Sequence, residues 1–126
     1  MRFGGDDSVR EFEIVFYAKP DGIEPAKDFL LSLNTKTRAK TVMLLELLSE
    51  NGSELREPYS KHLTDGIFEL RTKVGSDISR VLYFFVIGKK IVLTNGFIKK
   101  TQKTPQSEIE LAKKYRNDFL NREGRK

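Results

Sequence analysis

Cysteine is absent from this sequence of 126 residues, and histidine occurs once. The lack of cysteine excludes disulfide bonds, a thiolate nucleophile and a Cys-ligated zinc site. One histidine does not complete a zinc centre by itself, and the carboxylates show no spacing typical of a metal site. A glycine-rich phosphate-binding loop is also missing. We therefore expect a protein that works with no metal and no cofactor.

Long hydrophobic runs are missing as well. No apolar run approaches the ~20 residues that a membrane-spanning helix needs, and the N-terminus has no hydrophobic signal segment. We expect a cytoplasmic protein with no membrane partner. Hydrophobic residues make up 38% of the chain and charged residues 33%, which is typical of a folded globular protein. The length fits one domain over residues 1–126, with residues 1–9 as a flexible leader.

Positive charge is in excess, and the excess lies in the last part of the chain. Residues 99–126 carry nine Lys or Arg and four Asp or Glu, which accounts for the whole net charge of +5. A basic segment on a neutral body predicts a polyanionic partner, such as nucleic acid, or an acidic protein. A solvated, lysine-rich terminal helix would give the same charge, so charge alone leaves both interpretations open.

Hydrophobic periodicity predicts one strand and two helices in the first half of the chain. Residues 11–18 alternate between apolar and polar side chains, as in a half-buried strand. Pro25 then opens a short helix at a position where its missing N–H costs nothing. A second helix is expected over residues 36–50, with Thr35 as its N-cap and Gly52 as its C-terminal stop.

Three more strands and a helix are predicted for the second half. Residues 67–73 alternate, residues 79–87 are nearly all apolar as in a central strand, and residues 90–98 return as the fourth strand. Arg80 stands at the start of the apolar strand, where we expect it to reach solvent. Pro105 starts the last helix. The fold class is therefore α+β, in the order β-α-α-β-β-β-α, with a mainly antiparallel four-stranded sheet, an N-terminal helical hairpin and a C-terminal helix.

The side chains suited to chemistry are cationic. Adjacent antiparallel strands bring their ends together, so Arg71, Arg80 and Lys99 or Lys100 are expected to share one face. Guanidinium groups bind phosphate bidentately and stabilise the extra negative charge of a pentavalent transition state. RNA supplies its own nucleophile, the 2′-hydroxyl group, so its cleavage needs only a base, an acid and charge stabilisation. The same stretch contributes further basic side chains: Lys61, His62, Lys73 and Lys103.

Proton transfer has several candidates, and structural roles explain some of these residues equally well. Glu57, Glu69, His62 or a lysine can act as base or acid. Glu69 and Arg71 can instead form an exposed ion pair worth ~0 to 1 kcal/mol. Lysines at the end of the fourth strand can simply protect a sheet edge. Residue chemistry thus predicts a small RNA-binding or RNA-cleaving domain without deciding between binding and cleavage.

Four stretches carry a resemblance to a known group of proteins: residues 57–63 (EPYSKHL), 66–71 (GIFELR), 79–84 (SRVLYF) and 97–112 (FIKKTQKTPQSEIELA). The last is the most specific, with a Phe and two lysines before a Thr-Pro helix start. Together they resemble the HigB-like branch of the RelE/ParE toxin superfamily of type II toxin–antitoxin systems, which includes phage-derived relatives. A weaker resemblance extends back to Glu11.

The resemblance implies an activity and a set of partners. It implies a toxin that acts as a metal-independent endoribonuclease, or mRNA interferase, usually on messenger RNA in the ribosomal A site, and so inhibits translation. It also implies a cognate helix-turn-helix antitoxin, similar to HigA, that neutralises the toxin. Operator DNA would then be contacted only through the antitoxin.

The resemblance also implies roles for individual residues. Arg80 matches the arginine that contacts the scissile phosphate, and Arg71 matches a basic position closing the second strand. Relatives carry phosphate-binding or proton-transfer groups in the loop around His62 and after the fourth strand. The implied catalytic set is Arg80, Arg71, His62, Glu57 and Lys100. The implied RNA-binding set is Lys61, Lys73, Lys99 and Lys103.

The sequence departs from its relatives at two places. Ile67 and Glu69 stand where some relatives carry strand lysines. No His or Tyr follows the fourth strand, so a lysine or His62 would have to protonate the leaving 5′-oxygen. Two alternatives therefore remain open: a gyrase-poisoning, ParE-like toxin that binds without cleaving, and a catalytically inactive module that binds RNA or an antitoxin.

Overall fold

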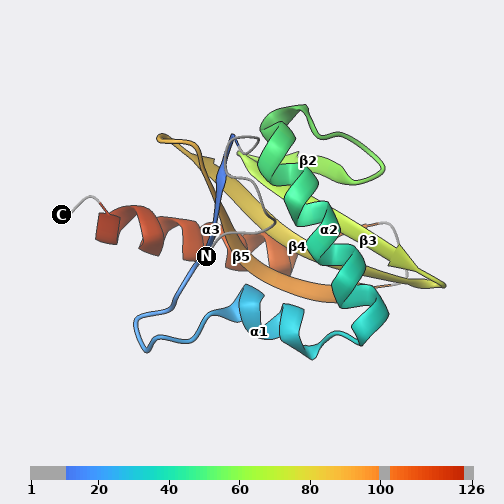
Figure 1. Cartoon of the computed structure of the whole chain (residues 1–126). Helices are drawn as coiled ribbons and strands as arrows, with labels where there is room; N and C mark the ends of the chain where they lie inside the picture. Colours follow the sequence, from blue (N-terminus) through green and yellow to red (C-terminus); the bar gives the residue numbers. More distant parts are fainter. Residues whose placement is uncertain (1–10, 100–102, 124–126) are drawn as a thin grey trace.

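A computed structural model describes residues 11–99 and 103–123 of the chain (Figure 1). The elements, in chain order, are β1 (Glu13–Phe16), α1 (Pro25–Ser32), α2 (Thr35–Asn51), the 3-10 helix η2 (Gly52–Glu54), β2 (Ser60–Thr64), β3 (Ile67–Val74), β4 (Asp77–Val86), β5 (Lys90–Lys99) and α3 (Gln106–Glu123). The expected leader over residues 1–9 lies outside the described residues. No helix in the described ranges is both long and apolar enough to cross a bilayer.

Within the described residues, five strands form one sheet in the order β1-β5-β4-β3-β2. β1 runs parallel to β5, and the other neighbouring pairs are antiparallel. The predicted α+β fold is confirmed, with the order β-α-α-β-β-β-β-α. The sheet has one strand more than expected, because the segment before β3 also pairs with it.

The additional strand is β2, which lies at the edge of the sheet and was not predicted. Its sequence, SKHLT, is mostly polar and shows no apolar alternation. It forms because the turn at Asp65 and Gly66 folds the chain back onto β3. Both residues have positive φ, 50° and 76°, as a two-residue type I′ hairpin turn requires. The Asp-Gly pair was the available sequence signal for this hairpin.

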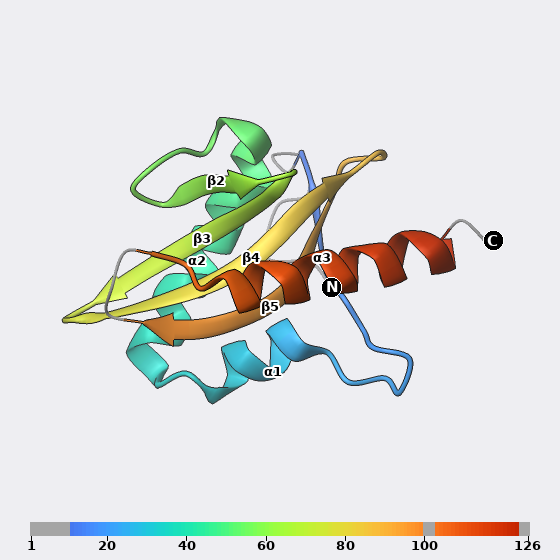
Figure 2. The same ribbon diagram turned by 180° about the vertical axis from the view of Figure 1, so that it is seen from behind.

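Helices cover both faces of the sheet (Figures 1 and 2). α1 and α2 lie on one face, where Val81 and Tyr83 of β4 join a hydrophobic cluster with Leu44 and other residues. α3 lies on the opposite face, where Leu82 and Phe84 join a second cluster. Successive residues of β4 are therefore buried on alternate faces, which explains its continuous apolar run.

Local chemistry fixes how the two N-terminal helices are placed. The side chain of Asn34 accepts a hydrogen bond from the Thr37 N–H at 2.9 Å, so Asn34 is the N-cap of α2 and the assignment to Thr35 was wrong. α1 packs on β5 at Gly96, where a β-carbon would collide with the Phe29 ring. A larger residue at Gly96 would therefore push α1 away from the sheet.

Candidate functional site

Arg71 and Arg80 lie directly opposite each other on β3 and β4. Directly opposed residues of antiparallel strands point to the same face, and here it is the face covered by α3. The Arg80 side chain is fully buried, with 0% exposed, and its guanidinium carbon lies 5.9 Å from the centroid of the Phe97 ring. The expectation that Arg80 reaches solvent was therefore wrong. β4 is a central strand, and residues near the start of α3 cover this end of it.

Glu69 holds this group of side chains together. It shares the face of Arg71 on β3, and its side chain is also fully buried. Its Oε1 accepts a hydrogen bond from Arg71 Nε at 2.5 Å, while Oε2 lies 3.8 Å from Arg80 Nη1. Oε2 also accepts a hydrogen bond from the hydroxyl of Thr104. We call Glu69, Arg71, Arg80 and Thr104 the buried arginine cluster.

The charges of the buried arginine cluster do not cancel. Burial lowers the pKa of Arg80, the nearby Glu69 carboxylate raises it, and Arg71 lowers it further. An arginine still keeps its charge at physiological pH. Glu69 is the carboxylate that contacts both guanidinium groups. The four residues of the cluster carry two positive charges and one negative charge, and Arg71 reaches solvent with 13% of its side chain exposed.

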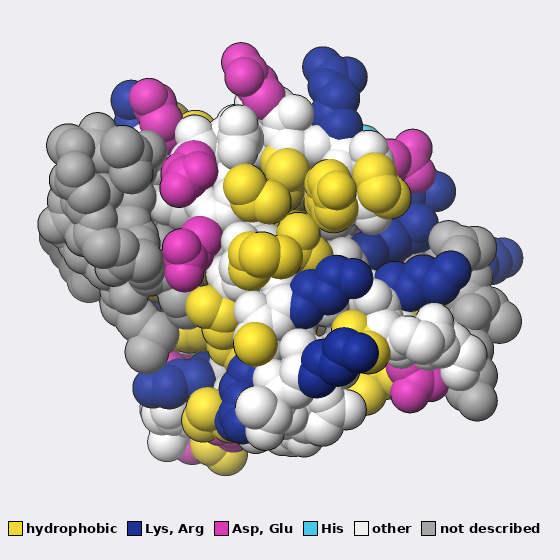
Figure 3. All heavy atoms as spheres, turned by 45° about the vertical axis from the view of Figure 1, so that its right-hand side comes forward, with side chains coloured by type: hydrophobic (Ala, Val, Ile, Leu, Met, Phe, Trp, Pro, Cys, Tyr) yellow, Lys and Arg dark blue, Asp and Glu magenta, His cyan; other side chains and the backbone are white. Residues whose placement is uncertain are grey.

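Exposed lysines surround the cluster on the same face of the sheet. Lys61 of β2 lies opposite Glu69, Lys73 lies two residues beyond Arg71, and Lys99 of β5 lies opposite Ile78 of β4. Lys103 stands exposed just before α3. Lys100 lies outside the described residues. Figure 3, which brings forward the right-hand side of Figure 1 with α2 still toward the viewer, shows further Lys and Arg side chains gathered beside exposed hydrophobic side chains.

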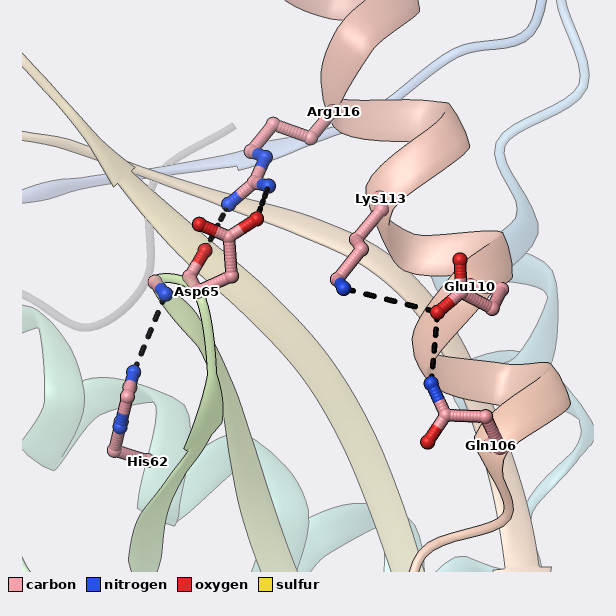
Figure 4. Close-up of polar contacts among 7 residues, drawn as sticks. His62, Asp65, Gln106, Glu110, Lys113 and Arg116 are labelled. Carbon is pink, nitrogen blue, oxygen red and sulfur yellow. Dashed lines mark hydrogen bonds and ion pairs between the residues drawn. The ribbon is translucent and has the colours of Figure 1, made fainter.

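His62 and Glu57 belong to a different surface. His62 lies opposite Phe68 and so points to the other face of the sheet, where its ring contacts Phe68 at 4.9 Å between centroids. Its Nε2 accepts a hydrogen bond from the Gly66 N–H at 3.2 Å (Figure 4). Glu57, Lys61 and His62 line one pocket of about 580 Å³. The structure thus places these two proton-transfer candidates on a different surface from Arg71 and Arg80. Lys61 lines their pocket and also lies opposite Glu69, on the face of the arginines.

The β2–β3 hairpin is tied to α3 (Figure 4). Arg116 of α3 donates hydrogen bonds to the main-chain oxygen of Asp65 and, at 2.9 Å, to its carboxylate Oδ2. Further along the helix, Glu110 accepts a hydrogen bond from Gln106 at 2.7 Å and pairs with Lys113 at 3.7 Å. The contact with Asp65 holds the hairpin that carries Lys61 and His62 in a fixed position relative to α3.

Sequence reasoning underestimated Glu69 and missed Thr104. Glu69 was weighed as one partner of an exposed ion pair, but the pair is buried. A signal was available, because Glu69 shares its face with Ile67, a core residue with 0% exposure. Thr104 meets Glu69 only through the packing of α3, and the sequence contains no local sign of that contact. No group of three or more His, Cys, Asp or Glu suited to a metal occurs among residues 11–99 and 103–123.

Comparison with known protein families gives one match. Residues 28–117 match the family described as phage-derived protein Gp49-like (DUF891). The match extends from α1 into α3 and includes the buried arginine cluster and the pocket that Glu57 and His62 line. A comparison with curated proteins gives no significant match.

Proposed function

We propose that this chain, which belongs to the family of phage-derived Gp49-like proteins, is the toxin of a type II toxin–antitoxin system and cleaves messenger RNA. That family belongs to the HigB/RelE-like toxin group. The observation that carries the proposal is the buried arginine cluster, which sets Arg71 at the surface of a face rimmed by lysines. Such a face suits the phosphates of a single-stranded RNA.

In this proposal Arg71 binds the scissile phosphate. Its partly exposed side chain is oriented by the hydrogen bond from its Nε to Glu69. A guanidinium held in this way stabilises the charge that develops on a pentavalent phosphorus, and it needs no reorganisation during the reaction. Arg80 is buried and acts as a positioning residue. It holds the Glu69 carboxylate in place, and that carboxylate accepts the hydrogen bond that orients Arg71.

The chemistry requires no group beyond the RNA and the protein. The 2′-oxygen attacks phosphorus, the bond from phosphorus to the 5′-oxygen breaks, and the products are a 2′,3′-cyclic phosphate and a 5′-hydroxyl. One side chain takes the 2′-hydroxyl proton and another gives a proton to the 5′-oxygen. Glu57 and His62 lie on a different surface from Arg71, so a lysine on the face of Arg71, such as Lys61, is the nearer candidate for these steps. Lys61 links their pocket to the arginine side, so the RNA would cross the edge of the sheet at β2.

The proposed partners follow from this assignment. Lys61, Lys73, Lys99 and Lys103 would hold the RNA backbone and ribosomal RNA around the A site. A cognate helix-turn-helix antitoxin would neutralise the toxin, and it would carry any contact with operator DNA. Co-expression with the antitoxin should restore growth and yield a stable complex.

Induction of the chain without an antitoxin tests the proposal. The expected result is growth arrest together with new messenger 5′ ends that map to ribosome-bound positions. An Arg71→Ala variant should abolish both effects, and Lys114→Ala, an exposed change on α3, should leave them intact. Growth arrest with intact transcripts and an SOS response would instead identify a gyrase poison. Tolerated expression of the wild-type chain with no cleavage would leave only a binding module.

A further inference from the structure

We propose that a pocket beside the edge of β3 binds one nucleotide of a single-stranded RNA, with the base against Tyr59 and the phosphate near Lys40 and Lys73. The pocket has a volume of about 330 Å³. It is lined by Lys40, Leu44, Pro58, Tyr59, Arg71, Lys73 and Ile78. This inference rests on the proposed function, because it locates part of the same substrate.

The pocket exists because β2 does not cover the whole edge of β3. The paired residues of the two strands extend to Ser60 and Leu70, and the Arg71 N–H then donates to the Tyr59 main-chain oxygen at 2.8 Å. Beyond this point the edge of β3 faces α2. There the Lys73 main-chain oxygen accepts a hydrogen bond from Lys40 Nζ at 2.7 Å. A lysine side chain therefore stands where a neighbouring strand would continue.

The lining combines an aromatic surface with positive charge. Tyr59 is 44% exposed although it is a large aromatic residue, and together with Pro58 and Leu44 it forms an apolar wall. Lys40, Lys73 and Arg71 supply three cations, and no Asp or Glu is among the described residues that line the pocket. An inorganic anion would not need the apolar wall, and a neutral apolar ligand would not need the cations. A nucleotide uses both, because bases stack on aromatic rings and phosphate binds Lys and Arg.

Size and position narrow the choice of ligand further. A volume of about 330 Å³ lies at the lower end of the range for small-molecule sites, which suits one nucleotide rather than a folded segment of protein. Arg71 belongs both to this pocket and to the buried arginine cluster. A nucleotide in the pocket would thus place its phosphate beside the group that we assign to the scissile phosphate. The pocket would then recognise the base next to the cut.

Binding of a short RNA with 2′-O-methyl groups, which cannot be cleaved, tests the inference by fluorescence anisotropy. Tyr59→Ala should weaken binding about tenfold through the loss of one stacked base, whereas Tyr59→Phe should bind within about twofold of wild type because the ring remains. Lys40→Ala should lower the slope of log affinity against log salt by about 0.7. Ile87→Ala, at a fully exposed site on the β4–β5 turn, and Lys114→Ala serve as matched controls that should not change binding.

A photo-crosslink gives an independent test. An RNA that carries 5-iodouridine should crosslink to Tyr59 in wild-type protein, and mass spectrometry would locate the adduct. Wild-type affinity in Tyr59→Ala, or a crosslink only at distant residues, would overturn the assignment. Tyr59→Ala could also weaken the binding of uridine 5′-monophosphate and leave the binding of RNA unchanged. That result would assign the pocket to a free nucleotide and overturn its assignment to RNA. Loss of antitoxin binding with unchanged RNA binding would make the pocket a protein contact.

The experiments can contradict the assignment of the pocket and the proposed cleavage activity independently of each other. If wild-type protein cuts messenger RNA and Tyr59→Ala binds and cuts it equally well, the pocket assignment fails and the proposed function stands. If wild-type protein binds RNA through Tyr59 but cuts nothing, the proposed activity fails and the pocket assignment stands.

Discussion

Arg71 on β3 and Arg80 on β4 face each other across neighbouring strands, with the Glu69 carboxylate in contact with both. Two like charges directly opposed in a sheet repel each other, and here one of them is fully buried. Glu69 offsets this repulsion because its carboxylate lies beside both guanidinium groups. The first prediction therefore concerns this carboxylate.

Glu69→Gln should lower the free energy of unfolding by about 3–5 kcal/mol, because it removes the negative charge that lies beside two guanidinium groups, one of them fully buried. Denaturant unfolding followed by circular dichroism measures the change. Glu110→Gln, at an exposed ion pair on α3, is the matched control and should change stability by less than about 1 kcal/mol. Equal stabilities of the two variants would show that the buried pair contributes nothing.

Thr104→Val keeps the shape of the side chain but removes the hydroxyl that donates to Glu69. The expected loss is about 1.5–3 kcal/mol of unfolding free energy, as for a hydrogen bond to a charged group. Thr104→Ser retains the hydroxyl and should recover most of this loss. A valine variant as stable as wild type would mean that α3 docks without this hydrogen bond.

Part of this arrangement follows from the sequence, and part of it does not. Alternation and the apolar run predicted two neighbouring strands, because both signals are local, and the meeting of antiparallel strand ends then predicted that Arg71 and Arg80 share a face. β2 was not predicted, since its polar sequence becomes a strand only by pairing with β3. The burial of Arg80 and Glu69 was not predicted either. It depends on Thr104, 35 residues beyond Glu69 in the chain, and on the docking of α3, which no periodicity within β3 reveals.

Alkaline pH should destabilise the fold through a buried tyrosine. Burial raises the pKa of Tyr83 to about 12, and its hydrogen bond with Ser60 acts in the opposite direction. In the unfolded chain a tyrosine titrates near pH 10. Between these values the unfolded chain releases a proton that the folded protein retains. The free energy of unfolding should therefore fall with rising pH, by up to about 1.4 kcal/mol per pH unit for this group.

Denaturant unfolding at several pH values between 9 and 12 would measure this effect. Burial also raises the pKa of Tyr17 to about 12, so two groups contribute to the slope. Tyr83→Phe should remove the contribution of Tyr83 to this slope. Well below pH 10, where tyrosine is protonated in both the folded and the unfolded state, tyrosine titration should give no pH dependence in either protein. An unchanged slope in the variant would refute the role given to Tyr83.

Lys61→Ala should weaken binding of single-stranded RNA and reduce its salt dependence. Each lysine that neutralises a phosphate contributes about 0.7 to the slope of log affinity against log salt. Lys61 is exposed and lies opposite Glu69, between the arginine face and the pocket that Glu57 and His62 line. Anisotropy titrations over a range of salt concentrations would measure the change, with Lys27→Ala on α1 as the control. If the slope of log affinity against log salt were equal in Lys61→Ala and wild type, Lys61 would not contact an RNA phosphate.

The cleavage rate of ribosome-bound messenger RNA by the Arg71→Lys variant, measured by primer extension, tests the central claim most directly. Lysine keeps the positive charge but lacks the forked geometry that binds a phosphate and Glu69 together. The predicted result is a rate about 10²- to 10³-fold below that of wild type, in a protein with an unchanged circular dichroism spectrum. Cleavage by the folded variant at the wild-type rate would contradict the assignment of Arg71 to the scissile phosphate.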